Sequence, residues 1–135
     1  MKKKLFYPAI FHKAEEGGFW VTFPDIPECM TQGDDMEEAY MMASDALGLC
    51  LVDMETAKEP FPVPSSPDSI SLEAGSFLVV IEFDLLAYKK RTRSTAVKKT
   101  LSIPEWLNEE ALALNVNFSQ VLQDALMEIV KKAHA

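Results

Sequence analysis

The ten residues from Lys98 to Leu107, "KKTLSIPEWL", join a strand pattern to a helix pattern. Every second side chain before the proline is polar, and these are Lys98, Thr100 and Ser102. Leu101 and Ile103 have the opposite parity, so the two sets point to opposite faces of a strand. Pro104 suits the first turn of a helix, where no backbone N–H is needed. The stretch therefore predicts a short, one-sided strand that leads directly into a helix.

Two amphipathic helices are predicted after this strand. The first, in "EWLNEEALALN", carries Leu107, Ala111 and Leu114 on one stripe. A turn follows, and Asn117 can cap the second helix with Gln120 as its capping-box partner. The second helix has apolar residues at intervals of three and four: Phe118, Val121, Leu122, Ala125, Leu126, Ile129 and Val130. A strand and two helices in roughly forty residues bury too little surface to be stable alone.

A second copy of the chain would supply what this segment lacks. The lone strand has unpaired edges, and it can pair antiparallel with the same strand of a second chain while the helices of both chains pack together. The polar parity of both strands then forms one exposed face, and a two-stranded ribbon fits the major groove of B-DNA. We therefore expect a homodimer that binds double-stranded DNA through Lys98, Thr100 and Ser102.

Phosphate contacts are expected beside this ribbon. The start of the last helix, at Asn117 and Ser119, offers free backbone N–H groups to a phosphate. The basic stretch before the ribbon adds cations that position DNA without reading its sequence, and these are Lys89, Lys90, Arg91 and Arg93. Charge alone leaves two readings open for this stretch, a polyanion-binding segment or a solvated, flexible linker.

The whole C-terminal pattern is similar to a known DNA-binding fold. "VKKTLSIPEWLNEEALALNVNFSQVLQDAL", Val97–Leu126, resembles a ribbon-helix-helix domain, and the strand-proline-helix-turn-helix order covers residues 97–132. The resemblance implies that the three polar strand residues read bases, although Ser102 is smaller than many residues that the family uses there. Trp106 is then expected in the dimer core. Lys99 lies on the inward parity, and the pattern does not explain it.

The N-terminal part is predicted to be a sheet with one helix. "LFYPAIFHKAEEGGFWVTF" indicates a hairpin that turns at Gly17 and Gly18, and Pro8 places its first strand at a sheet edge or in a bulge. A short third strand follows, and then a helix capped by Asp34 or Asp35. The predicted buried stripe of that helix is Met36, Ala39, Ala43, Ala46, Leu47, Cys50 and Met54. After the proline-rich "KEPFPVPSSPDS", the run "SFLVVIEFDLLAY" predicts a fourth, well-buried strand that ends this part near Tyr88.

These elements predict an α+β protein with two domains. A β-β-β-α-β domain covers residues 1–88, a basic linker covers 89–96, and a β-α-α domain covers 97–135. Residues 1–88 hold five Lys and sixteen Asp or Glu, a net charge of -11, whereas residues 89–135 hold eight Lys or Arg and five Asp or Glu, a net charge of +3. The acidic part suits a basic partner, and the basic part suits a polyanion.

Nothing in the composition requires a metal, a cofactor or a membrane. Cys29 and Cys50 form no metal-binding pattern and are interpreted as buried, inert thiols. The apolar runs are too short to span a bilayer, and the basic start lacks a signal-peptide cleavage pattern, so a cytoplasmic protein is expected. An alternative function is a small metal-dependent ribonuclease-H-like nuclease with a dimerisation tail, for which Glu82 and Asp84 are the candidate carboxylates. His12, beside the hairpin turn, is expected to have a surface or strand-edge role.

The N-terminal sequence resembles the HicB family of antitoxins. The shared motifs are the Tyr-Pro start, the Gly-Phe-Trp-Val strand, the Phe-Pro-Asp-Ile-Pro-Glu-Cys loop and the Gln-Gly-Asp helix entry. The resemblance implies a truncated ribonuclease-H-like domain that binds and masks a HicA-type toxin, a small ribonuclease. It also implies operator binding and autoregulation. If the N-terminal domains also pair, two ribbons would make a tetramer.

Candidate toxin contacts lie on the second strand and the loop after it: Trp20, Phe23, Asp25 and Glu28. Tryptophan is a common interface anchor, and the two carboxylates can pair with a basic toxin surface. The alternative is that the two aromatic side chains are simply core residues. With this function, no catalytic residue is expected.

Overall fold

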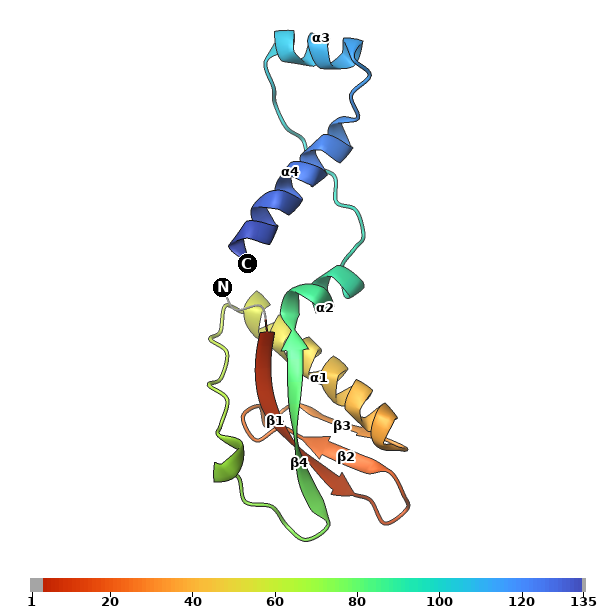
Figure 1. The fold of residues 1–135 in the computed structure, drawn as a ribbon, viewed down its shortest axis with the longest axis vertical. Helices are drawn as coiled ribbons and strands as arrows, with labels where there is room; N and C mark the ends of the chain where they lie inside the picture. Colours follow the sequence, from red (N-terminus) through yellow and green to blue (C-terminus); the bar gives the residue numbers. More distant parts are fainter. Residues whose placement is uncertain (1–3, 135) are drawn as a thin grey trace. The chain divides into compact units, whose positions relative to one another are not determined.

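The computed structural model describes residues 4–134, which divide into two compact units. The N-terminal unit covers residues 4–92, and the C-terminal unit covers residues 93–134 (Figure 1). Among the described residues, no helix is both long and apolar enough to span a lipid bilayer.

The N-terminal unit is a four-stranded antiparallel sheet with one long helix on it. The strands are β1 (Lys4–Lys13), β2 (Phe19–Thr22), β3 (Met30–Gly33) and β4 (Ser76–Asp84), and their order in the sheet is β3-β2-β1-β4. The β1–β2 hairpin is confirmed, with Gly17 and Gly18 at φ 96° and 77°, a region that glycine enters without strain. Helix α1 (Met36–Thr56) packs along one face of this sheet (Figure 1).

The start of α1 follows from its capping residues. Asp35 is the N-cap, and its carboxylate accepts the backbone N–H of Glu38 at 2.8 Å. The Glu38 carboxylate reaches back to the backbone N–H of Asp34 at 3.2 Å. The first contact satisfies a backbone donor that the first turn of a helix leaves without a partner, and the second ties Glu38 to the residue before the N-cap. The predicted helix entry is therefore confirmed.

One side of the strands and one stripe of α1 form the core. On β1 the core side chains Tyr7, Ala9 and Phe11 share one parity, and Pro8, of the opposite parity, is also buried. On α1 the buried residues are Ala39, Ala43, Leu47, Gly48, Leu51 and Val52. The predicted stripe is largely confirmed, because its members Ala46, Cys50 and Met54 also pack against this core, whereas Met36 is exposed.

Two expectations about the strands are wrong. β1 is an interior strand that pairs with both β2 and β4, so it is not an edge strand. Pro8 is nevertheless compatible with this position because the β1–β2 ladder begins at Ile10, which leaves Pro8 paired on the β4 side only. β4 is itself at the edge of the sheet, and Val80 and Glu82 on one of its faces are exposed, so this strand is less buried than its apolar run suggests.

The chain does not pass from β4 into a linker. Leu85–Thr92 forms helix α2, which continues directly from the end of β4 (Figure 1). The Asp84 carboxylate accepts the backbone N–H of Ala87 at 3.0 Å and so starts this helix. The prediction of a linker over residues 89–96 is therefore wrong for its first half, and the non-helical segment begins at Arg93.

The C-terminal unit contains an extended segment and two helices. Residues 93–104 lie in no helix or strand, and helices α3 (Glu105–Ala113) and α4 (Phe118–Ala133) follow. Asn115, at φ 56°, ends α3, and the backbone N–H of Val116 donates to the carbonyl of Ala111 at 3.1 Å. Asn117 caps α4 as predicted, accepting the backbone N–H of Gln120 at 3.0 Å.

Candidate binding surfaces

The C-terminal unit has no buried side chain anywhere in residues 93–134. Its exposed large apolar residues form what we call the C-terminal apolar surface: Val97, Leu101, Ile103, Trp106, Leu107, Leu112, Leu114, Phe118, Val121, Leu126, Met127, Ile129 and Val130. Most of the stripe predicted on the last helix belongs to it. Exposed apolar area on this scale is unusual for a soluble monomer and marks a surface that another molecule covers.

The predicted base-reading residues lie in the extended segment before α3. Lys98, Thr100 and Ser102 are exposed there, as is Arg93, which was predicted to contact phosphate. Residues 93–104 show no strand pairing within the chain, and the predicted ribbon forms only when a second chain supplies the partner strand. The ribbon and the base contacts stay predictions.

The predicted phosphate site at the start of α4 is exposed. Ser119 lies in the first turn and is open to solvent. The side-chain oxygen of Asn117 accepts the Gln120 N–H, so it already satisfies one of the backbone donors there. The side-chain amide of Gln120 donates to Asp124 at 2.8 Å, and the reciprocal half of the predicted capping box is not observed.

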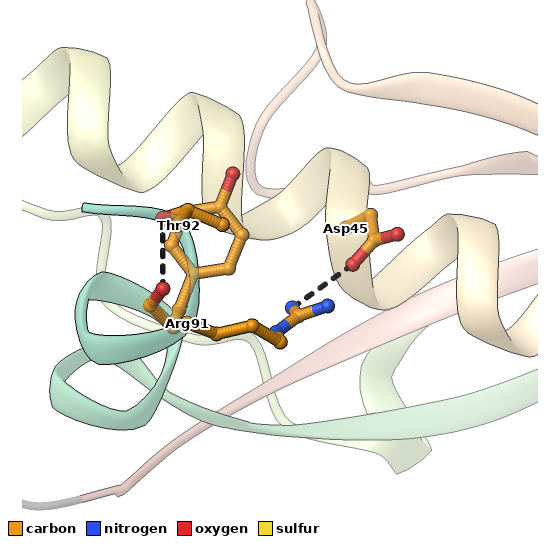
Figure 2. Close-up of polar contacts among 4 residues, drawn as sticks. Asp45, Arg91 and Thr92 are labelled. Atoms are coloured by element: carbon orange, nitrogen blue, oxygen red, sulfur yellow. Dashed lines mark hydrogen bonds and ion pairs between the residues drawn. The ribbon is translucent and has the colours of Figure 1, made fainter. Parts of the chain in front are cut away.

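The cations of the predicted basic linker bind carboxylates of α1. Arg91 Nη2 lies 3.2 Å from Asp45 Oδ1 (Figure 2), and Lys89 forms an ion pair with Glu55. The guanidinium carbon of Arg91 also lies 5.5 Å from the centre of the Tyr88 ring. At least two of the four cations predicted to contact phosphate are therefore engaged within the N-terminal unit.

Tyr88 holds α2 against α1 at a glycine. A Cβ at Gly48 would lie 2.6 Å from the Tyr88 ring, so only glycine leaves room for it. The ring centroids of Tyr88 and Phe83 are 5.4 Å apart. At the end of α2 the Thr92 hydroxyl donates to the Tyr88 carbonyl at 2.8 Å (Figure 2). Packing therefore fixes α2, since exposed ion pairs contribute roughly 0–1 kcal/mol each.

The four predicted toxin contacts differ in how far they are exposed. Phe23 is buried in the core, which corrects its assignment. Asp25 is half-buried and accepts hydrogen bonds from the Ser65 backbone N–H at 2.9 Å and from its hydroxyl at 2.5 Å, so it ties the proline-rich loop to the sheet. Trp20 and Glu28 are exposed. Strand alternation alone separates Trp20 from Phe23, because the two residues have opposite parity.

The sheet face opposite α1 carries exposed apolar side chains from all four strands. We define this open sheet face by its exposed members Phe6, Trp20, Gln32, Met30, Val80 and Glu82 and by the half-buried Ile10, His12, Thr22 and Leu78. The strand register places these residues across from one another: Phe6 opposite Glu82, His12 opposite Trp20, and Trp20 opposite Gln32. The sequence contains a signal for this apolar face, because β1 and β4 carry apolar residues on both parities.

His12 and Trp20 form a fixed pair on this face. Their rings stack with centroids 3.7 Å apart and planes 11° from parallel. His12 Nε2 also shares a hydrogen bond with the Thr22 hydroxyl at 2.9 Å. Burial lowers the pKa of His12, and the nearby charge of Glu73 opposes this in part. His12 is therefore neutral at pH 7 and supports the tryptophan, a surface role consistent with its prediction.

The candidate carboxylates for a nuclease have other partners. Glu82 forms an ion pair with Lys4 at 2.6 Å, and Asp84 caps α2. Within residues 4–134, no three His, Cys, Asp or Glu side chains lie close enough together to hold a metal ion. The arrangement therefore offers the alternative nuclease function no metal site.

The two cysteines are free thiols inside the N-terminal unit. Cys29 is buried and Cys50 is half-buried. Burial raises the pKa of both, and for Cys29 the neighbouring Cys50 raises it further. Both are protonated at neutral pH, which fits their interpretation as inert packing residues.

Comparison with known families gives one consistent description. Residues 7–134 match the family described as "HicB_like antitoxin of bacterial toxin-antitoxin system". Among curated proteins, the chain is 43% identical over 72 residues to Antitoxin HicB 1 of Photorhabdus laumondii, covering 52% of this chain and 46% of that protein. It is 41% identical over 63 residues to Antitoxin HicB of Escherichia coli K12, covering 47% and 46%. The match thus spans about half the length of these relatives.

Solved structures resemble the chain over a greater length. A toxin–antitoxin complex from Streptococcus pneumoniae contains a chain with a TM-score of 0.61 and 29% identity, covering 93% of this chain and 98% of that one. A HicA3–HicB3 toxin–antitoxin complex has a TM-score of 0.51 and 26% identity, covering 59% and 99%. The antitoxin HicB of Burkholderia pseudomallei, at 20% identity and a TM-score of 0.55, shares the fold.

Proposed function

Because this chain belongs to the HicB-like antitoxin family of bacterial toxin–antitoxin systems, we propose that it binds and neutralises a HicA-type, mRNA-cleaving toxin and represses its own operon by binding operator DNA. In this proposal the protein performs no chemistry of its own. It acts in the cytoplasm, where both its toxin and its operator are found. The N-terminal unit has a truncated ribonuclease-H-like fold, and the C-terminal unit is one half of a ribbon-helix-helix dimer.

The observation that carries the proposal is the contrast between the two units. The N-terminal unit has a continuous buried core, whereas no residue of the C-terminal unit is buried. Capped helices without a core are stable only when a second molecule covers their apolar faces. The C-terminal apolar surface therefore supports a homodimer, and the exposed polar parity of residues 98–102 supports a DNA-reading face on the same dimer.

Charge supports the toxin partner. Residues 4–92 contain six Lys or Arg and sixteen Asp or Glu, a net charge of -10. An enzyme that cleaves RNA must attract a polyanion, so its active surface is basic. An acidic protein can cover that surface with complementary charge and exclude the RNA. Toxin binding is thus assigned to the N-terminal unit and DNA binding to the C-terminal unit.

A gel-shift assay with the promoter of the protein's own operon tests the DNA-binding half of the proposal. Lys98→Ala combined with Thr100→Ala should weaken operator binding at least about tenfold, because each good base contact contributes roughly 1–3 kcal/mol. The control is Lys13→Ala in the N-terminal unit, which also removes one exposed positive charge. Equal operator binding by the parent and the double variant would show that the ribbon does not read DNA.

Growth rescue tests the toxin-binding half. Co-expression of the parent protein with the toxin encoded in the adjacent reading frame should restore growth. The Lys98→Ala and Thr100→Ala double variant should rescue equally well, because its changes lie outside the N-terminal unit. Failure of the parent to rescue growth would contradict the antitoxin function itself.

A further inference from the structure

We propose that the open sheet face is the surface on which the basic toxin docks, with Trp20 as its anchor. This inference rests on the proposed antitoxin function, and it replaces the loop after β2 as the expected toxin contact. The partner of this face is a basic protein that presents apolar side chains within a positively charged rim.

The open sheet face has the composition of an interface. In an antiparallel sheet with one covered face, the other face normally carries polar side chains. Here Phe6, Trp20, Met30 and Val80 are all large, apolar and exposed, with Met30 at 65% and Trp20 at 45%. They come from all four strands. Trp20 and Met30 are diagonal neighbours on β2 and β3, Phe6 and Val80 are diagonal neighbours on β1 and β4, and the half-buried Ile10 and Leu78 lie between the two pairs. Such a patch on a monomer marks a binding site.

Trp20 is held ready for a partner. Stacking on His12 fixes its ring, and the hydrogen bond between His12 and Thr22 fixes the histidine in turn. A side chain that is already ordered loses little conformational entropy on binding. Tryptophan side chains of this kind are enriched among the residues that dominate binding energy. Met30, on the edge strand beside it, adds a flexible apolar contact that adapts to its partner.

Charge indicates which class of molecule binds this face. Exposed aromatic side chains on a sheet can stack nucleic-acid bases, but a unit with a net charge of -10 repels phosphate. The same charge opposes pairing with a second copy of this unit. A basic protein is attracted by it. On the face itself, Glu82 contributes a carboxylate that is 48% exposed despite its ion pair with Lys4.

The outer side of α1 is the competing surface, and it is less suited to this role. Met41 and Leu49 are exposed there, but Asp45 lies between them in the sequence and is bound to Arg91. The apolar residues of α1 are therefore interrupted by an ion pair, whereas on the sheet Trp20 and Met30, and likewise Phe6 and Val80, are diagonal neighbours on paired strands. This difference makes α1 a matched control.

Calorimetric titration of the full-length protein with a catalytically inactive form of the adjacent toxin tests the proposal. Met30→Asp should weaken toxin binding at least about tenfold, and Trp20→Ala should weaken it at least as much. Met41→Asp is the matched control, since Met41 is 60% exposed and receives the same new charge on α1. It should bind the toxin like the parent. Thermal unfolding of each variant checks that the N-terminal unit remains folded.

A charge swap at Gln32 tests the same face without touching its apolar members. Gln32 is exposed opposite Trp20, so Gln32→Lys should repel a basic partner while Gln32→Glu, of the same length as glutamine, should bind like the parent or more tightly. Equal binding by these two variants, or weaker binding by Met41→Asp than by Met30→Asp, would overturn the assignment of this face. If the parent itself does not bind the toxin, the proposed antitoxin function fails as well.

Discussion

Replacing Leu101 with alanine measures whether the C-terminal apolar surface holds two chains together. Leu101 lies on the parity predicted to face the dimer core, and 59% of its surface is exposed in the single chain. Leu→Ala removes three carbon groups, and burying each is worth about 0.8 kcal/mol, so full burial of the three is worth about 2.4 kcal/mol. Dimerisation can bury only the fraction of the Leu101 surface that is still exposed in the single chain. The stabilisation that Leu101→Ala removes from the dimer is therefore about 1.4 kcal/mol per chain.

Two chains contribute to each dimer, so the loss is about 3 kcal/mol per dimer. Since 1.4 kcal/mol is a factor of ten, the dissociation constant of the dimer should rise roughly 100-fold. Any cavity left at the interface would increase this further. Sedimentation equilibrium of the full-length protein over a range of concentrations measures the constant directly.

Leu72→Ala is the matched control for this experiment. It makes the same chemical change at an exposed leucine in the N-terminal unit, and it should leave the dissociation constant unchanged. Thr100→Ala, on the opposite strand parity, should also leave it unchanged while weakening operator binding. If Leu101→Ala dimerises like the parent, the reasoning that leads from an uncovered apolar surface to a ribbon-paired dimer is refuted.

Three further predictions concern contacts in the N-terminal unit. Asp35→Ala should lower the free energy of unfolding by about 1 kcal/mol in a urea titration, because it removes the N-cap of α1. Asp34→Ala, one residue earlier, should have little effect. Similar losses in the two variants would refute this capping assignment. The pKa of His12 is lowered by burial, so the unfolded chain binds more protons than the folded chain and stability should fall as pH drops below about 6.5. His12→Gln should reduce the drop in melting temperature between pH 7.5 and 5.5. An unchanged drop would contradict the conclusion that burial of His12 lowers its pKa. Lys98→Ala should reduce the slope of the logarithm of the operator-binding constant against the logarithm of salt concentration by about one. Arg91→Ala should change this slope less, because Arg91 is paired with a carboxylate on α1. Equal changes in slope would show that this ion pair opens when the protein binds DNA.

The features that follow from neighbouring residues could be predicted from the sequence. The turn at Gly17 and Gly18, the cap of α1 and the cap of α4 at Asn117 depend on backbone needs that a few adjacent residues satisfy. The charge difference between the two parts of the chain is a property of composition alone. The family resemblance rests on short motifs, and the family match over residues 7–134 confirms it.

Partners distant in the chain could not be predicted in this way. Cations that are adjacent in the sequence predict a DNA-contacting stretch, yet Arg91 pairs with Asp45, 46 residues away. Phe23 and Trp20 are close in sequence, but strand alternation separates them, so one lies in the core and the other on the open sheet face. The ion pairing of Arg91 and the burial of Phe23 depend on which surfaces α1 and α2 cover.

Sequence patterns alone predict where α1 and α4 begin, which strand residues share a face, and that the C-terminal residues cannot make a core alone. Those properties depend on local backbone geometry, on periodicity and on the number of apolar residues available. The arrangement of the elements in space established that β1 is interior, that carboxylates of α1 pair with part of the basic stretch, and that His12 and Trp20 stack on the open sheet face. Strand order, register and helix docking set these contacts, and they join residues whose separation along the chain carries no local signal.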